Sequence, residues 1–208
     1  MIISRILSGE SCALVTDAGM PAISDPGEEL VRECHDKNIP VVSVPGPCAF
    51  ATALAISGMD SKRFTFEGFL SVNKVSRREH LSSLVSEKRT MVFYEAPHKL
   101  SATLRDMLSS FGNRNIAIVR ELTKIHEEVI RTTLCKACEE YGNGEIKGEI
   151  VLIVEGAEEK KEEYTLEDAV KIARDEIKSG KSLNDSAKIS AKETGIKKSD
   201  IYKALQEE

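Results

Sequence analysis

A loop rich in small, cyclic and acidic residues is the part of this sequence best suited to hold a ligand. Thr16–Gly27 has the sequence Thr-Asp-Ala-Gly-Met-Pro-Ala-Ile-Ser-Asp-Pro-Gly and follows the short apolar run Ala13–Val15. Gly19 lets the backbone approach a ligand closely, and the carboxylates of Asp17 and Asp25 could accept hydrogen bonds from ribose hydroxyls or an amine. Ligands of open α/β sheets bind where strands end, so we expect a binding loop here rather than a plain connector.

A second loop of similar character, Pro45–Ala49, follows the apolar run Val41–Val44. Its small residues Cys48 and Ala49 leave room for a flat ligand against the start of a helix. No sequence feature supplies a base for the Cys48 thiol, so we interpret this cysteine as a packing residue and not as a nucleophile. Neither loop has the glycine spacing of a dinucleotide-binding fingerprint or a P-loop.

Charged side chains gather after two further predicted strands, at Glu95-Ala-Pro-His98 and at Arg120-Glu-Leu-Thr-Lys124. Carboxylates and imidazoles can take up a proton, and the candidates for that role are Glu95, His98 and Glu121. Cationic side chains bind phosphate, and the candidates for that role are Arg77, Arg78, Arg120 and Lys124. Taken singly, each group also fits an ion pair that caps a strand, or a solvated histidine.

The composition is that of a globular protein, with 41% hydrophobic and 30% charged residues and a net charge of −5. The charge is uneven, because residues 1–60 carry 3 basic and 8 acidic side chains whereas residues 61–131 carry 13 basic and 8 acidic ones. An electropositive middle segment suits a polyanionic partner, although ordinary surface variation would look the same.

Cysteine usage and hydropathy favour a cytoplasmic protein. Five cysteines scattered through apolar segments indicate reduced thiols. The pair Cys135-Lys-Ala-Cys138 has no second pair and no HxxxH motif after it, so we expect no metal site. No secretory signal is visible, and no apolar run approaches the ~20 residues that span a bilayer. We therefore expect no membrane association.

Hydrophobic periodicity predicts an α/β protein with a helical tail. Strands are predicted at 13–15, 41–44, 64–66, 90–94, 115–119, 128–133 and 149–155. Helices are predicted at 28–37, 49–57, 74–88, 99–111, 136–141, 166–179, 183–194 and 200–206. The first part indicates a mostly parallel sheet covered on both faces, and the second a mixed sheet. The predicted parts are an α/β domain at 1–59, a second α/β domain at 60–156, and a linker with a helical segment at 157–208.

The C-terminal segment begins with a run of glutamates and lysines and continues with three predicted helices. Two helices are preceded by N-cap signals, Thr165 with Asp168 and Ser182 with Asp185. Residues 181–205 hold six lysines against three acids, which suits a helix-turn-helix-like segment. For lack of base-reading side chains, we favour a plain helical cap on the main domain.

Six motifs in this order resemble the ribosomal RNA small subunit methyltransferase I family, a branch of the tetrapyrrole (corrin/porphyrin) methylase superfamily. They are Thr16–Gly27, Pro45–Ala49, Phe66-Glu-Gly-Phe-Leu70, Phe93-Tyr-Glu-Ala-Pro-His98, Arg120-Glu-Leu-Thr-Lys124 and Lys147-Gly-Glu-Ile-Val151. The resemblance implies a homodimer of chains with two α/β domains, with S-adenosyl-L-methionine folded in the cleft between those domains. It also implies 2′-O-methylation of a cytidine ribose in the decoding region of 16S rRNA, on the small ribosomal subunit.

Carried onto this sequence, the resemblance assigns cofactor contacts to Asp17, Ala18, Gly19, Ile23, Pro47, Cys48, Ala49, Tyr94, Glu95, Gly148 and Glu149. The sulfonium is already a good leaving group, so the protein needs to hold the methyl group in line with the ribose oxygen in a dry cleft. A base that takes the hydroxyl proton would help, and the candidates are Glu95, His98 and Glu121. Phosphate contacts are expected from Arg77, Arg78 and Lys124.

The sequence departs from this family at its start. Members begin with a strand and a Gly-Asn-Leu-type loop, whereas Met1 falls in the helix expected just before Ala13. We therefore expect a truncated first domain with an incomplete sheet that lacks part of the active cleft. Two other functions stay open: methylation of a tetrapyrrole, which needs a wide apolar cleft, and a non-catalytic module for RNA binding or dimerisation.

Overall fold

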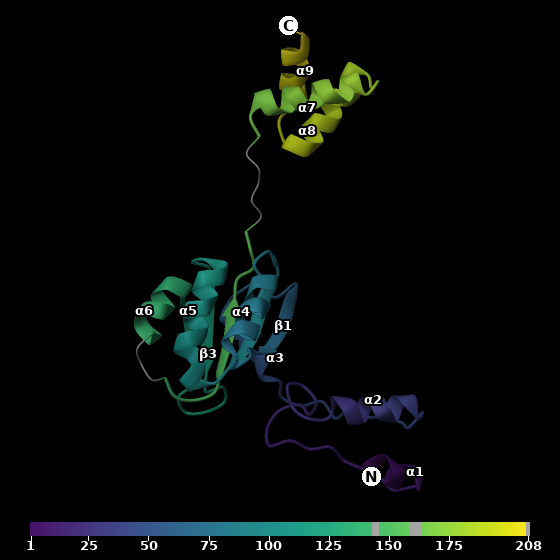
Figure 1. Cartoon of the computed structure of the whole chain (residues 1–208), viewed down its shortest axis with the longest axis vertical. Coiled ribbons are helices and arrows are strands. Elements are labelled where there is room, and N and C mark those ends of the chain that lie inside the picture. Colours follow the sequence, from purple (N-terminus) through teal and green to yellow (C-terminus); the bar gives the residue numbers. More distant parts are fainter. Residues whose placement is uncertain (143–145, 159–163, 207–208) are drawn as a thin grey trace. The chain divides into compact units, whose positions relative to one another are not determined.

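The computed structural model describes residues 1–142, 146–158 and 164–206, which belong to two compact units (Figure 1). The first unit, residues 1–158, contains a mixed β-sheet with helices on both faces. The second, residues 159–208, has helices as its described elements. The α/β fold expected from the sequence is confirmed, whereas a division of the first unit at residue 59 stays a prediction.

The sheet of the first unit has five strands in the order β1-β2-β5-β3-β4. Their bounds are β1 Phe64–Phe69, β2 Thr90–Glu95, β3 Asn115–Arg120, β4 Glu128–Thr133 and β5 Ile150–Val154. β1 and β2 are parallel, whereas β5 runs antiparallel to both β2 and β3, and β3 runs antiparallel to β4. The expected mixed sheet is therefore confirmed, and β1, β2 and β3 all end at the same end of it.

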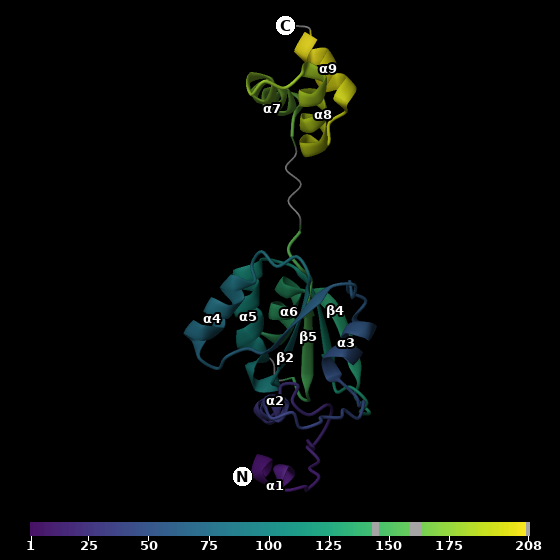
Figure 2. The same ribbon diagram turned by 90° about the vertical axis from the view of Figure 1, so that its right-hand side faces the viewer.

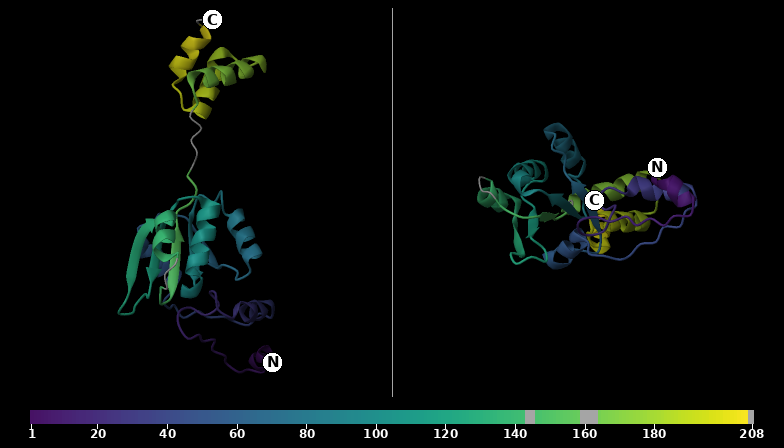
Figure 3. Two further views of the ribbon diagram at one scale, coloured as in Figure 1. Left: turned by 60° about the vertical axis from the view of Figure 1, so that its left-hand side comes forward. Right: turned by 90° about the horizontal axis from the view of Figure 1, so that it is seen from below.

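Alternate residues of the central strands enter two separate hydrophobic cores, as the two-residue period of a strand requires. On β2, Met91 and Phe93 belong to one core and Val92 to the other. The helices around the sheet are α3 (Ala49–Ser57), α4 (Lys74–Ser83), η1 (Pro97–Lys99), α5 (Leu100–Phe111) and α6 (Leu134–Tyr141). Figure 2 shows α3 on one side of the sheet and α4 and α5 on the other, and Figure 3 gives two further views of these layers.

Helix α3 consists of small and apolar residues, so its backbone can approach the sheet closely. Ala53 is fully buried and Leu54 nearly so, and both pack against the core that contains Val92. The helix ends at Gly58, which has the left-handed φ of 70° that favours glycine. The expected close packing of this helix on a sheet is confirmed.

The prediction of strands at 13–15 and 41–44 is wrong. Neither segment pairs with another strand among the described residues. Side chains that a sheet would cover are exposed: Val15 by 81%, Val42 by 86% and Val44 by 83%. A strand exists through its ladder of hydrogen bonds, so β-favouring residues without a neighbouring strand stay irregular.

Most other elements lie close to their expected bounds. The helices α1 (Ile2–Leu7) and α2 (Glu28–Asp36) precede α3 along the chain. Helix α4 ends at Ser83, five residues earlier than expected. The Ser83 hydroxyl donates a hydrogen bond of 2.7 Å to the carbonyl of His80, a local contact of the kind that competes with the backbone ladder of a helix.

The second unit consists of α7 (Leu166–Lys178), α8 (Leu183–Thr194) and α9 (Lys198–Gln206). They pack around a small core made of Ala169, Ala173, Ala187 and Ile201. Both N-cap signals are confirmed, because Thr165 and Asp168 form a capping box and the Ser182 hydroxyl accepts the N–H of Asp185.

Candidate functional site

The two loops of small residues lie against each other at one end of the first unit. A Cβ atom placed on Gly19 would be 3.5 Å from the carbonyl oxygen of Pro47, and one on Gly46 would be 3.3 Å from the sulfur of Met20. Gly19 has a φ of +81°, a conformation that side chains rarely adopt. The expected convergence of the loops is therefore present, although the flanking strands that motivated it are absent.

The first loop also contacts the sheet. The Ser24 hydroxyl lies 3.6 Å from where a Cβ on Gly68 would be, and Gly68 follows a bulge in β1 that begins after Phe66. Within the loop, the Thr16 hydroxyl donates a hydrogen bond of 3.0 Å to the carboxylate of Asp25. The loop is therefore held near the carboxyl end of β1, the end at which α/β sheets bind ligands.

Tyr94, near the end of β2, joins the second loop to the sheet. Its hydroxyl accepts a hydrogen bond of 3.1 Å from the backbone N–H of Phe50, in the first turn of α3. Burial raises the pKa of Tyr94, the N–H of Phe50 lowers it, and the nearby Cys48 thiol and Asp25 carboxylate raise it further. The net effect raises the pKa, so Tyr94 is a neutral phenol. Residues of both loops contribute to this shift.

Aromatic rings form an apolar surface beside Tyr94. Phe66 stacks on Phe50 with ring centroids 4.5 Å apart, and Tyr94 lies 4.9 Å from Phe66 and 5.4 Å from Phe69. Phe69 is 54% exposed, so part of this surface faces solvent. Sequence reasoning did not select these phenylalanines, although two of them belong to a motif that it quoted. An exposed ring here suits stacking by a flat ligand.

Glu95 closes β2 and holds the turn that follows. Its carboxylate, in a residue only 3% exposed, accepts hydrogen bonds from the N–H of Ala96 at 2.8 Å and the hydroxyl of Thr103 at 2.5 Å. Lys99, at the end of η1, pairs with it at 3.2 Å. His98, between these residues on η1, is exposed. Glu95 is therefore fully engaged, and His98 is accessible.

The end of β3 carries a second charged group. Lys124 Nζ lies 3.0 Å from Glu121 Oε1 and 3.3 Å from Glu149 Oε2, and Glu121 Oε1 also accepts the N–H of Glu149 at 3.0 Å. Lys124, together with this N–H, lowers the pKa of Glu121. A Cβ on Gly148 would lie 2.4 Å from the Glu121 side chain, so a larger residue there requires Glu121 to move. The structure therefore brings together four of the residues selected from sequence.

The two candidate arginines of α4 share one carboxylate. Arg77 pairs with Asp106 at 2.7 Å, and Arg78 reaches the same carboxylate at 3.2 Å. Burial by itself would raise the pKa of Asp106, but these two ion pairs lower it below its usual value. The Arg77 side chain is only 11% exposed, whereas that of Arg78 is 56% exposed. Arg78 is therefore accessible to a phosphate, and Arg77 mainly joins α4 to α5.

The other predicted cofactor contacts lie in the two loops. Cys48 is half-buried, and the exposed members are Asp17, Ala18, Gly19, Ile23, Pro47 and Ala49. Small exposed residues of this kind leave backbone N–H and C=O groups accessible to a ligand.

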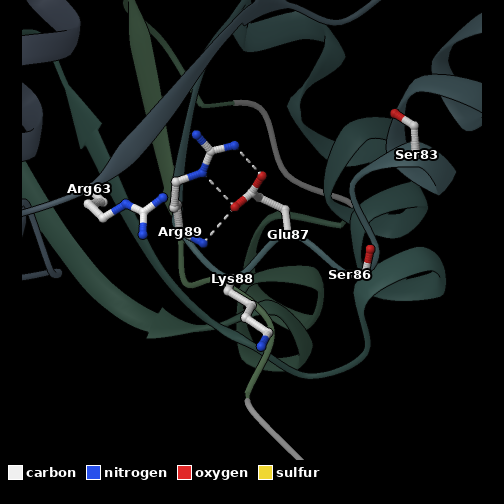
Figure 4. Close-up of a pocket in the computed structure, with 6 residues that line it drawn as sticks. All are labelled: Arg63, Ser83, Ser86, Glu87, Lys88 and Arg89. Carbon is white, nitrogen blue, oxygen red and sulfur yellow. Dashed lines mark hydrogen bonds and ion pairs between the residues drawn. The ribbon is translucent and has the colours of Figure 1, made fainter.

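A hollow in the surface lies at the other end of the sheet. It is lined by Arg63, Ser83, Ser86, Glu87, Lys88 and Arg89, as Figure 4 shows. Arg63 and Arg89 directly precede β1 and β2, so this hollow is remote from the loops at the carboxyl ends. The Arg89 guanidinium binds the Glu87 carboxylate and lowers its pKa to about 2, which neutralises part of the positive charge (Figure 4).

Other site types find no match in the described part of the chain. There, His, Cys, Asp and Glu side chains do not gather in threes or more where they could hold a metal ion. Within the same residues, no helix is both long and apolar enough to cross a membrane. All five cysteines are free thiols.

Comparisons with known proteins agree with the fold and with the sequence motifs. The family described as Tetrapyrrole (Corrin/Porphyrin) Methylases matches residues 1–138. A protein of Xylella fastidiosa named ribosomal RNA small subunit methyltransferase I is 44% identical over 97% of this chain and 74% of its own length. The protein of the same name from Halalkalibacterium halodurans is 43% identical over the whole of this chain and 73% of its own length.

Solved structures of low sequence identity share the fold. Uroporphyrin-III C-methyltransferase from Thermus thermophilus, complexed with S-adenosylhomocysteine, matches with a TM-score of 0.52 at 16% identity, over 74% of this chain and 70% of that one. Cobalt precorrin-4 methyltransferase matches with a TM-score of 0.50 at 16% identity, over 66% of this chain and 61% of that one. Family match, relatives and fold agree, and the chain belongs to the ribosomal RNA small subunit methyltransferase I family, among the tetrapyrrole methylases.

Proposed function

We propose that this chain uses S-adenosyl-L-methionine to methylate the 2′-hydroxyl of a cytidine ribose in 16S rRNA of the small ribosomal subunit. The relatives that share 43–44% of its residues carry names that specify methylation of this RNA. The observation that carries the proposal is that both loops meet the carboxyl end of the sheet, the first against Gly68 of β1 and the second through the bond of Phe50 to Tyr94. The proposal places the chain in the cytoplasm and requires neither a metal nor a membrane.

The residues at this end fit the cofactor. Gly19 has a left-handed backbone and lies close to Pro47, so the loops form a narrow backbone-lined surface that a side chain would fill. Asp17 and Asp25 supply carboxylates that can accept hydroxyl and amine hydrogens, and the exposed ring of Phe69 can stack on a flat base. When bound, the cofactor supplies an electrophilic methyl group.

The protein's task is then to orient the ribose and to receive its proton. Glu95 already accepts two hydrogen bonds and an ion pair, which suits a role in positioning the turn after β2. Glu121 is held in its charged form by Lys124, so it is a weak base. His98 is exposed at the same strand end as Tyr94, so its imidazole is accessible to a ribose hydroxyl there. Among the three candidates, this geometry favours His98 as the base.

Phosphate contacts in this unit are proposed for Arg78 and Lys124. Both side chains are about half exposed, and each is paired with a carboxylate that holds it in place. Arg77 was predicted with them, and its buried ion pair with Asp106 favours a structural role.

A homodimer is part of the proposal. Val15, Val42 and Val44 are more than 80% exposed, and contact with a second copy would remove such side chains from water. Light scattering on the purified chain tests this, because a monodisperse monomer at micromolar concentration would contradict the dimer and leave the methylase proposal standing.

Two measurements test the methylase proposal. Calorimetry is expected to show binding of S-adenosylmethionine by the chain and loss of that binding in Gly19→Trp, because an indole would fill the space beside Pro47. Gly9→Trp is the matched control, since Gly9 also has a positive φ but open space around it. Transfer of tritiated methyl groups to unmethylated small ribosomal subunits tests the acceptor. Transfer to a tetrapyrrole alone would overturn the acceptor, and absence of cofactor binding would overturn the proposal itself.

A further inference from the structure

Positive charge in the second unit is concentrated in its last two helices. Residues 164–180 hold three basic and four acidic side chains, whereas residues 181–206 hold six lysines and three acids. The surplus therefore lies on α8, on α9 and on the turn between them.

Two lysines at the end of α7 and just after it are paired with acids of that helix. Lys178 lies 3.0 Å from Asp175, and Lys181 pairs with Glu176. These pairs are the short-range contacts that ordinarily accompany surface helices.

A second set of lysines has no such ion pairs in the part of the chain that the structure describes. This lysine cluster comprises Lys188, Lys192, Lys197 and Lys198. All four are exposed, and within the described residues none of their ammonium groups takes part in a hydrogen bond or an ion pair. Two neighbouring carboxylates are already engaged, since Asp185 accepts from the Ser182 hydroxyl and Asp200 from that of Ser199. The exposed Glu193 offsets one charge of the cluster and leaves the rest.

The cluster surrounds one turn of the chain. Lys192 lies in the last turn of α8, Gly195 reverses the chain with a φ of 73°, and Lys198 is the first residue of α9. Lys197 lies within this turn, and Lys188 lies four residues before Lys192 on the same helix face. The four lysines therefore lie between residues 188 and 198, on the last two turns of α8 and around the turn that leads into α9.

Stability of the helices does not explain this arrangement. Like charges four residues apart on a helix repel each other, as Lys188 and Lys192 must. A lysine in the first turn of α9 also gains nothing from the helix dipole. Charges that weaken their own helices are expected where a partner of opposite sign neutralises them.

The described surface of the second unit lacks the apolar patch that a protein partner or a membrane would require. Leu166, at the start of α7, is the large hydrophobic residue exposed on the described part of this unit. Protein interfaces have an apolar core, and helices that bind membranes insert an apolar face. The neighbouring Ile196 and Tyr202 pack against the core of this unit, and exposed lysines beside them suit the phosphate backbone of a nucleic acid.

We propose that the lysine cluster of α8 and α9 is a second RNA-contacting surface, which binds the phosphate backbone of the ribosomal RNA substrate without reading its sequence. The inference rests on the proposed function and extends it, because it assigns RNA binding to the second unit. It replaces the plain helical cap that the sequence favoured.

The test compares two triple variants of the full chain. The first, Lys192→Gln/Lys197→Gln/Lys198→Gln, removes three charges of the cluster. The matched control, Lys171→Gln/Lys178→Gln/Lys181→Gln, removes three charges from the α7 side of the same unit. Binding of labelled 16S rRNA is measured by filter retention between 50 and about 200 mM salt, the range over which phosphate contacts dominate affinity. Circular dichroism verifies that both variants are folded.

The cluster variant is expected to bind the RNA at least tenfold more weakly than the control. Its salt dependence should also fall by about two to three units of slope, one for each lost phosphate contact. S-adenosylmethionine binding should be unchanged in both variants. Equal RNA affinity of the two variants would overturn the inference, whereas failure of the unaltered chain to bind either cofactor or RNA would overturn the proposed function instead.

Discussion

The Tyr94 hydroxyl accepts a hydrogen bond of 3.1 Å from the backbone N–H of Phe50. This bond joins the carboxyl end of β2 to the first turn of α3. The N–H groups of that turn have no acceptor within the helix and need one outside it. Cys48 and Asp25 both raise the pKa of Tyr94, so its hydroxyl lies near residues of both loops of the candidate site. The phenol of Tyr94 therefore adds a polar tether to the apolar contacts that hold the start of α3 on the sheet.

Tyr94→Phe is expected to destabilise the first unit by about 1–2 kcal/mol, because it leaves the N–H of Phe50 without its partner. Affinity for S-adenosylmethionine should fall as well, since the loop before α3 loses its tether. Urea unfolding and calorimetry measure the two effects. Tyr202→Phe, in the second unit, is the control and should change neither quantity. An unaltered cofactor affinity in Tyr94→Phe would show that the loop is held by other contacts.

Gly148→Ala is expected to disrupt the charged group at the end of β3. The added Cβ would lie 2.4 Å from the Glu121 side chain, so Glu121 must leave Lys124. Because Glu121 is a flexible side chain outside the core, the cost is that of its lost ion pair and hydrogen bond, about 1 kcal/mol. Gly180→Ala is the matched control, because Gly180 has a φ of +97° against +96° for Gly148 and open space around it. This variant therefore suffers only the backbone strain of a positive φ. Equal stability of the two variants in thermal unfolding would contradict the predicted clash.

Asp106 is expected to make stability depend on acid pH. Its pKa is lower in the folded chain than in the unfolded one, where it is about 3.9. Its contribution is therefore complete above the unfolded pKa and is lost as the pH falls through the folded pKa. Asp106→Asn should cost about 2–3 kcal/mol at pH 7, because it leaves the buried Arg77 uncompensated, and should flatten the acid limb of the stability curve.

The control for this change is Asp175→Asn, whose ion pair with Lys178 is exposed. Exposed pairs contribute less than about 1 kcal/mol, so this variant should keep the acid limb of the unaltered chain. Denaturant titrations between pH 2 and pH 7 compare the variants. A curve for Asp106→Asn that runs parallel to that of the unaltered chain would contradict the assignment.

Sequence periodicity predicts the bounds of those helices and strands whose packing partners belong to the same part of the chain. Helix α3, strand β4 and helix α8 have the bounds that were expected, because their apolar faces meet the cores that the periodicity implies. The segments 13–15 and 41–44 have equally β-favouring residues and form no strand. Local preference cannot supply a pairing strand, so it cannot distinguish the two cases.

Residue types predicted which groups are charged but not how they are paired. Arg77 and Arg78 are adjacent in sequence, yet Asp106 on another helix buries the first and leaves the second half exposed. The bond from Phe50 to Tyr94 joins residues 44 positions apart and has no sequence signal. The ion pair of Glu95 with Lys99 crosses the turn after β2, where the four-residue spacing of a helix does not apply.

Arg78 should therefore affect RNA binding separately from stability. Its side chain is 56% exposed and shares Asp106 with Arg77, so Arg78→Gln keeps the buried pair and should change the free energy of unfolding by less than about 1 kcal/mol. Loss of one phosphate contact should weaken binding of 16S rRNA and lower the salt dependence by about one unit of slope. Cofactor affinity should be unchanged.

Two further variants complete this test. Arg32→Gln removes an arginine that is similarly exposed, at 63%, and paired with Glu28 on α2, and it should leave RNA binding unaltered. Arg77→Gln should instead unfold at a lower urea concentration, since it leaves the carboxylate of Asp106 buried with a weaker partner. If Arg78→Gln and Arg32→Gln bind the RNA equally well, the RNA does not reach α4. Lys124, which follows β3, is then the remaining candidate for a phosphate contact in the first unit.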